Sequence, residues 1–358
     1  MKRKKTIDSL YYITHIDNIA SILQKGILSH ANIQRTNIKP TSIYDRQIVT
    51  NRSSKNTPDS KSLWEYANFY FQARNPMLYR VINENKDKGI VVLSIQPKII
   101  NFPGTFITTG NAASNLTEII PSNLWNEKAL VDQIIQNIDI EWWKEEDGTK
   151  RKIMAECLVP DIVSSDFIQA IYVPTENIAN KLKNIIQENG LSHLSKLPIS
   201  IEPNMFFLPQ KRISLTNTVS IVEGDMFFSK MQTLTISVNC VGVMGKGLAS
   251  TAKYRFPDMY VYYQDLCKNK TLQMGNPKLH KRESSIFDQL AEDTYSFPYK
   301  NGETWFLLFP TKQHWRNKAD IEGIEQGLNW LQENYKQEGI KSLAIPALGC
   351  GLGKLEWS

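Results

Sequence analysis

The chain has 358 residues, of which 41% are hydrophobic and 22% carry a charge, and its formal net charge is +6. This length accommodates about two domains of ordinary size, and the composition excludes a disordered or fibrous protein. No stretch approaches the roughly 18 consecutive apolar residues that span a membrane, and the sequence after the basic MKRKK start is too polar for a signal peptide. We therefore expect a cytoplasmic protein without a membrane partner. The positive charge is compatible with a nucleic-acid substrate but does not by itself indicate one.

The cysteines and histidines show no metal-ligand spacing. The four cysteines are scattered without a CxxC pair, at positions 157, 240, 267 and 350. Such a distribution is typical of reduced thiols in a cytosolic protein, not of a disulfide framework or a zinc site. The five histidines are equally dispersed. We expect no bound metal.

The first part of the chain alternates helical and extended patterns. Helices are indicated by apolar residues at helical spacing with Gly26 and Gly190 near their ends, and buried strands by short apolar runs. The expected elements are helices over 18–26 and 177–188 and strands over 90–97, 102–106 and 155–159. Residues 45–62 are polar and lack periodicity, so we interpret them as a surface loop and a candidate lid or recognition segment.

Residues 203–217 contain two prolines, a basic pair and a polar stretch, which indicate a domain junction. Strands and helices alternate beyond it, which predicts a parallel or mixed sheet with helices on its faces. The expected elements are strands over 219–223, 233–239, 305–309 and 342–346, helices over 248–256 and 320–336, and a loop or hairpin insertion over 280–303. In the last helix, the predicted apolar face consists of positions 321, 324, 328, 331 and 335.

Two glycine-rich turns follow apolar strands in this second part. They are VNCVGVMGKGLA at 238–249 and AIPALGCGLG at 344–353. In open α/β sheets, ligands bind beyond the carboxyl ends of the strands, and free N–H groups of glycines there can cradle phosphate oxygens. Two such loops can hold a diphosphate from both sides. The simpler interpretation is that the glycines only permit tight turns.

These loops, with VEGDMF at 222–227 and GCGLGKLEW at 349–357, make residues 218–358 resemble a macrodomain, the ADP-ribose-binding α/β/α fold. The resemblance implies that Asp225 meets the adenine amino group, that the backbone of Met226 lies nearby, and that Asn239 faces the distal ribose. The residues that it assigns to the diphosphate are Gly245, Gly247, Leu248, Gly349, Cys350, Gly351, Leu352 and Gly353. Macrodomains of this type continue past the LEW motif with a last helix and strand, so we expect an incomplete domain.

The motif FPTKQHWR at 309–316, followed by DIEGIEQGL, resembles the DarG subfamily of macrodomains, which removes ADP-ribose from DNA. This resemblance implies a catalytic role for Lys312, since a lysine amine with a lowered pKa can attack the anomeric carbon of an opened ribose. The alternative is a solvated lysine at a strand end. Related hydrolases carry an Asp where this chain has Gly353, so chemistry here must proceed without that carboxylate.

In the first part, Glu156 is a charged residue inside the apolar run MAECLV. Such a carboxylate is either a solvent-facing strand position or a functional group at a cleft, and periodicity alone favours the first. Aromatic and basic residues also cluster over 61–80. They could form a stacking platform for single-stranded DNA, but most of the aromatics are expected in the core.

Several motifs of the first part resemble those of the DarT family of DNA ADP-ribosyltransferase toxins. These motifs are YYITHIDNIASILQKGIL at 11–28, the segment from Ser42 to Arg52, NFYFQARNPMLY at 68–79 and KIMAECLVP at 152–160. Asn75 replaces the family's commoner Ser. The resemblance implies an α+β ADP-ribosyltransferase fold in which Glu156 takes a proton from the acceptor base and Arg52 binds a phosphate of NAD and positions the reacting ribose. The residues that it places in the NAD pocket are His15, Tyr44 and Met77.

Both motif sets on one chain predict a fused toxin–antitoxin protein, with a transferase over 1–208, a linker over 209–217 and a macrodomain over 218–358. We expect transfer of ADP-ribose from NAD to thymine in single-stranded DNA, and its removal from ADP-ribosylated DNA by the macrodomain. The choice of thymine follows from the resemblance alone. One alternative is a transferase acting on RNA or protein with an ADP-ribose reader attached. Another is an ADP-ribose sensor with a degenerate first half, which the intact Arg52 and Glu156 disfavour.

Overall fold

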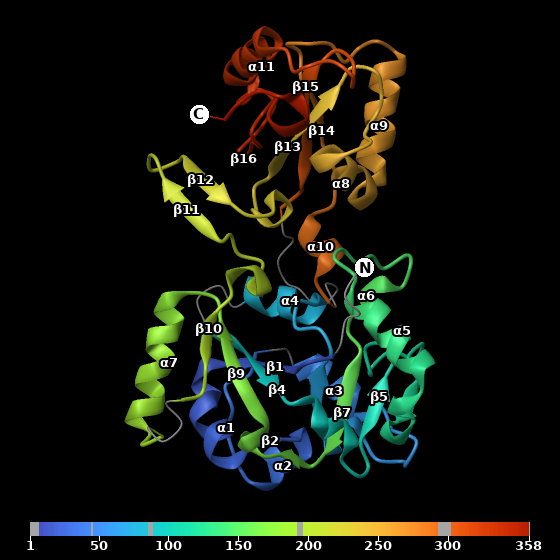
Figure 1. Cartoon of the computed structure of the whole chain (residues 1–358), viewed down its shortest axis with the longest axis vertical. Coiled ribbons are helices and arrows are strands. Elements are labelled where there is room, and N and C mark those ends of the chain that lie inside the picture. The colour runs from blue at the N-terminus through green and yellow to red at the C-terminus, as the bar shows by residue number, and fades with distance from the viewer. Residues whose placement is uncertain (1–6, 44–45, 85–88, 192–195, 293–301, 358) are drawn as a thin grey trace. The chain divides into compact units, whose positions relative to one another are not determined.

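The computed structural model describes residues 7–43, 46–84, 89–191, 196–292 and 302–357. The chain divides into two units (Figure 1), of which the first comprises Met1–Val222 and Leu290–Thr294, and the second Glu223–Gln289 and Tyr295–Ser358. Tyr44 of the predicted NAD pocket lies outside the described residues. None of the described helices combines the length and apolar character that crossing a bilayer requires.

The first unit contains a mixed sheet in the order β10-β9-β4-β1-β3-β7-β5-β6 (Figure 1). Neighbouring strands are antiparallel except for β9 and β10, which are parallel. The strands are β1 (Leu10–His15), β3 (Tyr66–Tyr70), β4 (Ile90–Ile95), β5 (Phe106–Thr108), β6 (Ile119–Pro121), β7 (Glu156–Pro160), β9 (Ile168–Val173) and β10 (Ile199–Ile201), and the short β2 (Ile27–Leu28) and β8 (Ile162–Val163) pair with each other.

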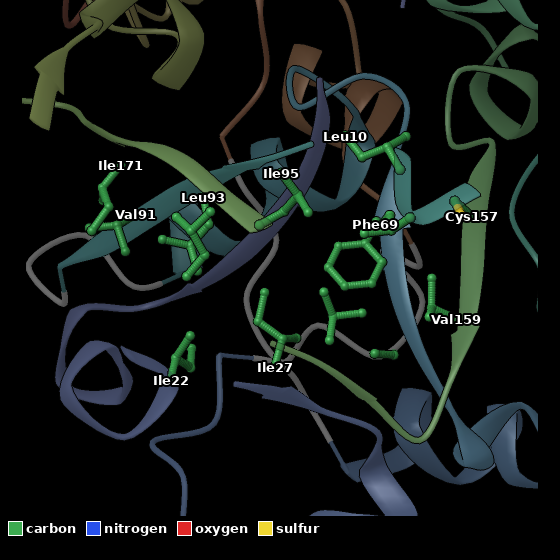
Figure 2. Close-up of a cluster of buried hydrophobic side chains, with 14 of the residues drawn as sticks. Leu10, Ile22, Ile27, Phe69, Val91, Leu93, Ile95, Cys157, Val159 and Ile171 are labelled. Atoms are coloured by element: carbon green, nitrogen blue, oxygen red, sulfur yellow. The ribbon is translucent and has the colours of Figure 1, made fainter. Parts of the chain in front are cut away.

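A continuous apolar core holds this sheet in place. Every residue of β4 is buried, as its uninterrupted IVVLSI run predicts for a strand covered on both faces. Figure 2 shows part of the cluster, in which Leu10, Phe69, Leu93 and Val159 come from four different strands. Buried side chains of α1 (Ile19–Lys25) and α7 (Glu176–Glu188) complete it. The central strands therefore have a fixed register, and the functional residues at their ends have fixed positions.

The other helices of this unit are α2 (His30–Arg35), α3 (Arg46–Ser53), α4 (Pro76–Glu84), α5 (Lys128–Ile138) and α6 (Thr149–Lys152). Helix α3 corrects the prediction of a loop over 45–62. Its sequence RQIVTNRS shows no apolar face at helical spacing, and the helix is held instead by a tertiary contact of Arg52.

The strand predicted over 102–106 is also wrong. A 3₁₀ helix over Pro97–Asn101 and a following turn precede β5, which begins only at Phe106. The aromatic cluster over 61–80 is core as expected, since Tyr66, Phe69, Tyr70 and Phe71 are buried.

The second unit contains a sheet in the order β14-β15-β13-β16, in which β15, β13 and β16 are parallel and β14 is antiparallel. This confirms the mixed α/β arrangement that the alternating pattern predicts. The strands are β13 (Thr233–Asn239), β14 (Lys278–His280), β15 (Trp305–Lys312) and β16 (Leu343–Ala344), and the helices of this part of the chain are α8 (Gly247–Arg255), α9 (Pro257–Lys268), α10 (Ile286–Leu290) and α11 (Ile321–Asn334). A hairpin of β11 (Lys211–Ser214) and β12 (Ser220–Glu223) includes much of the predicted linker, whose boundaries stay a prediction.

Helix α11 forms where it is predicted, and Ile324 and Leu331 of the predicted apolar face are buried, but Ile321, Leu328 and Tyr335 are not. Ile321 is 62% exposed, while Gly323, Ile324, Gly327 and Leu331 are the buried positions. A Cβ added to Gly327 would lie 2.6 Å from Cζ of Phe309 on β15. The helix therefore packs closely through glycines, which a search for apolar side chains does not count.

Candidate active sites of the two units

The first candidate site is centred on a buried ion pair between Arg52 and Glu156. Arg52 comes from the last turn of α3 and Glu156 is the first residue of β7. Nη1 of Arg52 donates to Oε1 of Glu156 at 3.1 Å and Nη2 donates to Oε2 at 2.9 Å. The side chains are 17% and 0% exposed, respectively. Glu156 is therefore not a solvent-facing strand residue, and the interpretation that periodicity alone favours is wrong.

The electrostatics of this pair follow from its burial and geometry. Burial alone would lower the pKa of Arg52, but the nearby carboxylate of Glu156 and its hydrogen bonds raise that pKa above its ordinary value. A planar guanidinium meets a carboxylate through two parallel bonds, which fixes orientation as well as charge. The pair is thus a preorganised arrangement of two opposite charges buried at the start of β7.

Further hydrogen bonds fix the carboxylate and the start of its strand. The backbone N–H of Ala112 donates to Oε1 of Glu156 at 2.9 Å, and the N–H of Glu156 donates to Oγ1 of Thr108 at 2.8 Å. Thr108 is fully buried and donates in turn to the carbonyl of Gly110 at 2.6 Å. Sequence reasoning missed Thr108 and Ala112, because a hydroxyl in a short strand and a backbone N–H carry no motif.

A second carboxylate, Glu292, also belongs to this unit and lies near Arg52. Nδ2 of Asn111 donates to Oε1 of Glu292 at 2.5 Å, and the charge of Glu292 contributes to the raised pKa of Arg52. The preceding Leu290 is fully buried and accepts a hydrogen bond from Nε1 of Trp143 at 2.8 Å. A short segment from the predicted 280–303 insertion therefore contributes an acidic residue to the surroundings of Arg52. No motif in the sequence indicates this contribution.

The predicted NAD-pocket residues His15 and Met77 are both 6% exposed. His15 ends β1, and its Nδ1 accepts a hydrogen bond from the N–H of Asp17 at 3.1 Å. The strand register links Glu156 through Tyr70 to Tyr11, four residues before His15. Tyr11 lies level with Glu156 across the sheet. At about 3.4 Å per residue, His15 lies roughly 14 Å further along the strand direction. Glu156 is therefore level with the start of β1, whereas His15 lies at the end of that strand.

The second candidate site lies where β13 and β15 end side by side. The parallel register pairs Asn239 with Lys312 after an irregularity that follows Val238. Oδ1 of Asn239 accepts from the hydroxyl of Tyr263 at 3.0 Å and from the N–H of Val241 at 3.0 Å, while its Nδ2 donates to the carbonyl of Val243 at 2.6 Å. Asn239 thus shapes the first glycine loop. Tyr263 on α9 was missed by the sequence reasoning.

Lys312 is only 9% exposed, so it is not a solvated lysine at a strand end. Its Nζ donates to the carbonyl oxygen of Leu352 in the second glycine loop at 3.0 Å. Burial lowers the pKa of Lys312, and the neighbouring charge of Lys354 lowers it further. A larger fraction of neutral amine at physiological pH follows from these two effects.

The two glycine loops face each other beside these strand ends. A Cβ on Gly247, where α8 begins, would lie 3.7 Å from Cδ1 of Leu352. Gly349 has φ +75°, and a Cβ there would lie 2.5 Å from Cδ1 of Leu355, so only glycine fits. The other residues predicted to hold the diphosphate lie on the same loops and are Gly245, Leu248, Cys350, Gly351 and Gly353.

Asp225 and Met226 lie at a short 3₁₀ helix, Met226–Phe228. Oδ1 of Asp225 accepts from the N–H of Phe227 at 3.0 Å, and Oδ2 accepts from Nη1 of Arg255 at 2.8 Å. The carboxylate is thereby held in one orientation. Among the described residues, no group of three or more His, Cys, Asp or Glu side chains is arranged to hold a metal ion.

Comparison with known proteins fits this two-site architecture. Residues 11–207, more than half of the chain, match the family model described as ssDNA thymidine ADP-ribosyltransferase, DarT. The chain belongs to the DarT family. A DNA ADP-ribosyl transferase–DNA ADP-ribosyl glycohydrolase fusion protein of Thermosipho africanus is 55% identical over 350 residues, which are 98% of this chain and 88% of that protein.

The structure of Thermosipho africanus DarTG in complex with ADP-ribose has a TM-score of 0.87 and 54% sequence identity to this DarT-family chain, covering 98% of this chain and 89% of that one. A DNA ADP-ribosyl glycohydrolase of Thermus aquaticus is 35% identical over 136 residues, which are 38% of this chain and 34% of that protein. The expected fold class, an ADP-ribosyltransferase fold followed by a macrodomain, is confirmed by these likenesses.

Proposed function

We propose that the first unit transfers ADP-ribose from NAD to thymine in single-stranded DNA and that the second unit removes it, so that one chain carries both toxin and antitoxin activities. The buried, doubly hydrogen-bonded Arg52–Glu156 pair in the DarT-like part supports this best. We assign the transferase to residues 1–208, the linker to 209–217 and the macrodomain to 218–358. We also propose a cytoplasmic location, where NAD and DNA are both available.

In the transfer step, Glu156 acts as the general base. As N3 of thymine forms a bond to C1′ of the ribose, the bond from C1′ to nicotinamide breaks, nicotinamide leaves, and the N3 proton passes to Glu156. Arg52 has five N–H donors, so it can keep one on Glu156 while others bind the diphosphate of NAD. His15, Met77 and Tyr44 line the cofactor pocket. The separation of His15 from Glu156 along the sheet suits a whole dinucleotide and not a nicotinamide ring alone.

In the removal step, the two glycine loops hold the diphosphate through backbone N–H groups, and Asn239 binds the distal ribose. Asp225 binds the adenine amino group beside the backbone of Met226. Lys312 adds as a neutral amine to the anomeric carbon of the opened ribose. The bond from that carbon to N3 of thymine then breaks, and the base leaves unmodified with the proton that the amine gives up. Water hydrolyses the resulting lysine Schiff base, which releases ADP-ribose and restores the amine. The lowered pKa and the burial of Lys312 support this role, because only the neutral amine is nucleophilic.

Incubation of the full chain with NAD and a single-stranded oligonucleotide, followed by mass spectrometry, tests both halves. We expect the ADP-ribosylated strand to accumulate with Lys312→Ala, to accumulate less with the native chain, and not to form with Glu156→Ala. No DNA product from the Lys312→Ala chain would contradict the transferase assignment, and label found on RNA or protein in its place would support the alternative substrates. Slower accumulation with Lys312→Ala than with the native chain would contradict removal by the second unit.

A further inference from the structure

The loop that follows Lys312 carries a stack of side chains that the proposed chemistry does not use. The ring of His314 lies 5.3 Å from that of Trp315 at an interplanar angle of 30°, and Cζ of Arg316 lies 4.4 Å from the centroid of the indole. Trp315 is nevertheless 46% exposed. Large aromatic side chains usually bury most of their surface, so a tryptophan that stacks with its sequence neighbours and is still about half exposed indicates a binding function.

Backbone hydrogen bonds fix this loop beside the second candidate site. The N–H of Cys240 donates to the carbonyl of Gln313 at 3.2 Å, which links the loop to the end of β13 directly after Asn239. The N–H of Ala319 donates to the carbonyl of Gly353 at 2.9 Å, which links its far end to the second glycine loop. Trp315 therefore lies on a short segment that directly follows Lys312 and is anchored at both of its ends to the two loops of the site.

Exposed cationic side chains occur on the loop that carries Trp315 and at the end of the second glycine loop. Arg316, Lys318 and Lys354 are exposed, and the charge of Lys354 lowers the pKa of Lys312. Positive charge beside solvent-exposed aromatic rings is the combination with which proteins bind single-stranded nucleic acid, since phosphates meet the cations and bases stack on the rings. A duplex does not offer its base faces for such stacking.

We propose that His314, Trp315 and Arg316 form a stacking platform for a nucleobase of the ADP-ribosylated single strand, so that the second unit binds DNA as well as ADP-ribose. This inference rests on the proposed removal activity of the same site. The platform holds the strand while Lys312 reaches the anomeric carbon of the attached ribose. Loss of one stacked base is expected to weaken binding of the strand by about 10- to 100-fold.

The test uses the full chain with Glu156→Ala, which removes the forward reaction, and adds Trp315→Ala, Trp315→Phe or Tyr335→Ala. Tyr335 is a matched control because it is 39% exposed and lies four residues before Gly339, which is next to Trp305 at the start of β15, whereas Lys312 ends that strand. The substrates are an ADP-ribosylated single-stranded oligonucleotide and an ADP-ribosylated thymidine without flanking DNA. Free ADP-ribose is the binding probe.

We expect Trp315→Ala to raise KM for the oligonucleotide by about 10- to 100-fold, Trp315→Phe to restore most of the loss, and Tyr335→Ala to have no effect. Binding of free ADP-ribose and KM for the single nucleoside should stay unchanged. An unchanged KM for the oligonucleotide overturns the platform, as does an equal loss with free ADP-ribose, which would assign Trp315 to the ADP-ribose itself. Full removal activity in Lys312→Ala would instead overturn the proposed function, so the two failures are distinguishable.

Discussion

The two candidate sites would handle the same ADP-ribose group, yet they are built from different kinds of groups. In the first unit, two buried side chains of opposite charge hold each other at 2.9 and 3.1 Å. In the second unit, two glycine loops lie beside Lys312, whose amine donates to the carbonyl oxygen of Leu352 and not to a carboxylate. A transferase must take up a proton and stabilise charge, whereas a domain that grips a diphosphate needs mainly free backbone donors.

This difference determines how each site can be damaged. A buried ion pair fails when either partner is removed, because the remaining charge is left in an apolar environment. A glycine loop fails when a side chain is added at a position where the Cβ would occupy the space of a neighbour or where the backbone is left-handed. The following substitutions test this contrast.

The largest effect is expected for Glu156→Gln, which keeps the shape of the side chain but removes the base. Transfer to a single-stranded oligonucleotide should fall by about 10²- to 10⁴-fold in single-turnover assays in a Lys312→Ala background. Glu65→Gln is a matched control, because Glu65 also meets an arginine, Arg35, through two hydrogen bonds but at the surface. A comparable loss with Glu65→Gln would show that the effect is not specific to the site.

Removing the cation should destabilise the first unit. Arg52→Met leaves Glu156 buried without its counter-charge, and we expect a loss of about 3–5 kcal/mol in the free energy of unfolding. The double variant Arg52→Met with Glu156→Gln should recover most of this loss, while Arg35→Met at the exposed pair should cost at most about 1 kcal/mol. Urea titration monitored by fluorescence measures all three. Equal losses at the two pairs would contradict the difference in burial.

In the second unit, Gly349→Ala adds a Cβ within 2.5 Å of Cδ1 of Leu355 at a position with φ +75°. We expect a destabilisation of about 2–5 kcal/mol from left-handed strain and overpacking, with loss of ADP-ribose binding. Gly339→Ala is the matched control, since φ is +80° there but the added Cβ would lie 3.6 Å from Cη2 of Trp305, in ordinary contact. Its cost should be about 1–2 kcal/mol, without effect on ligand binding. Calorimetry and titration with ADP-ribose separate strain from crowding.

Glu292→Gln tests whether the acidic neighbour competes with the cofactor for Arg52. Removing this carboxylate should lower KM for NAD by up to about fivefold and leave kcat unchanged, the size expected for a partly exposed charge interaction. Asn111 can still donate to the amide oxygen of the new side chain, so the local hydrogen bond is kept. A higher KM would mean that Glu292 assists NAD binding.

The smallest predicted effect concerns pH. Burial and Lys354 lower the pKa of Lys312 in the folded state, so the folded chain binds fewer protons than the unfolded chain at pH values between the lowered pKa and the ordinary lysine value. The stability of the native chain relative to Lys312→Met should therefore rise as pH increases through this window and level off above it. Calorimetry at several pH values measures the difference, and a difference that falls with pH would contradict the lowered pKa.

The sequence by itself determined the family motifs, the strands that carry Glu156 and Asn239, the helix after the first glycine loop and the two-domain fold, because these depend on apolar runs and glycines that act locally. Only the tertiary structure decided which side chains come into contact at the two candidate sites. Helix α3 has no periodic signal, and Arg52 reaches Glu156 across 104 positions of chain. Thr108, Tyr263 and Glu292 carry no motif, and only the packing of distant segments brings them to the sites. Contacts between such segments depend on burial and register of the whole sheet, which no local window of sequence contains.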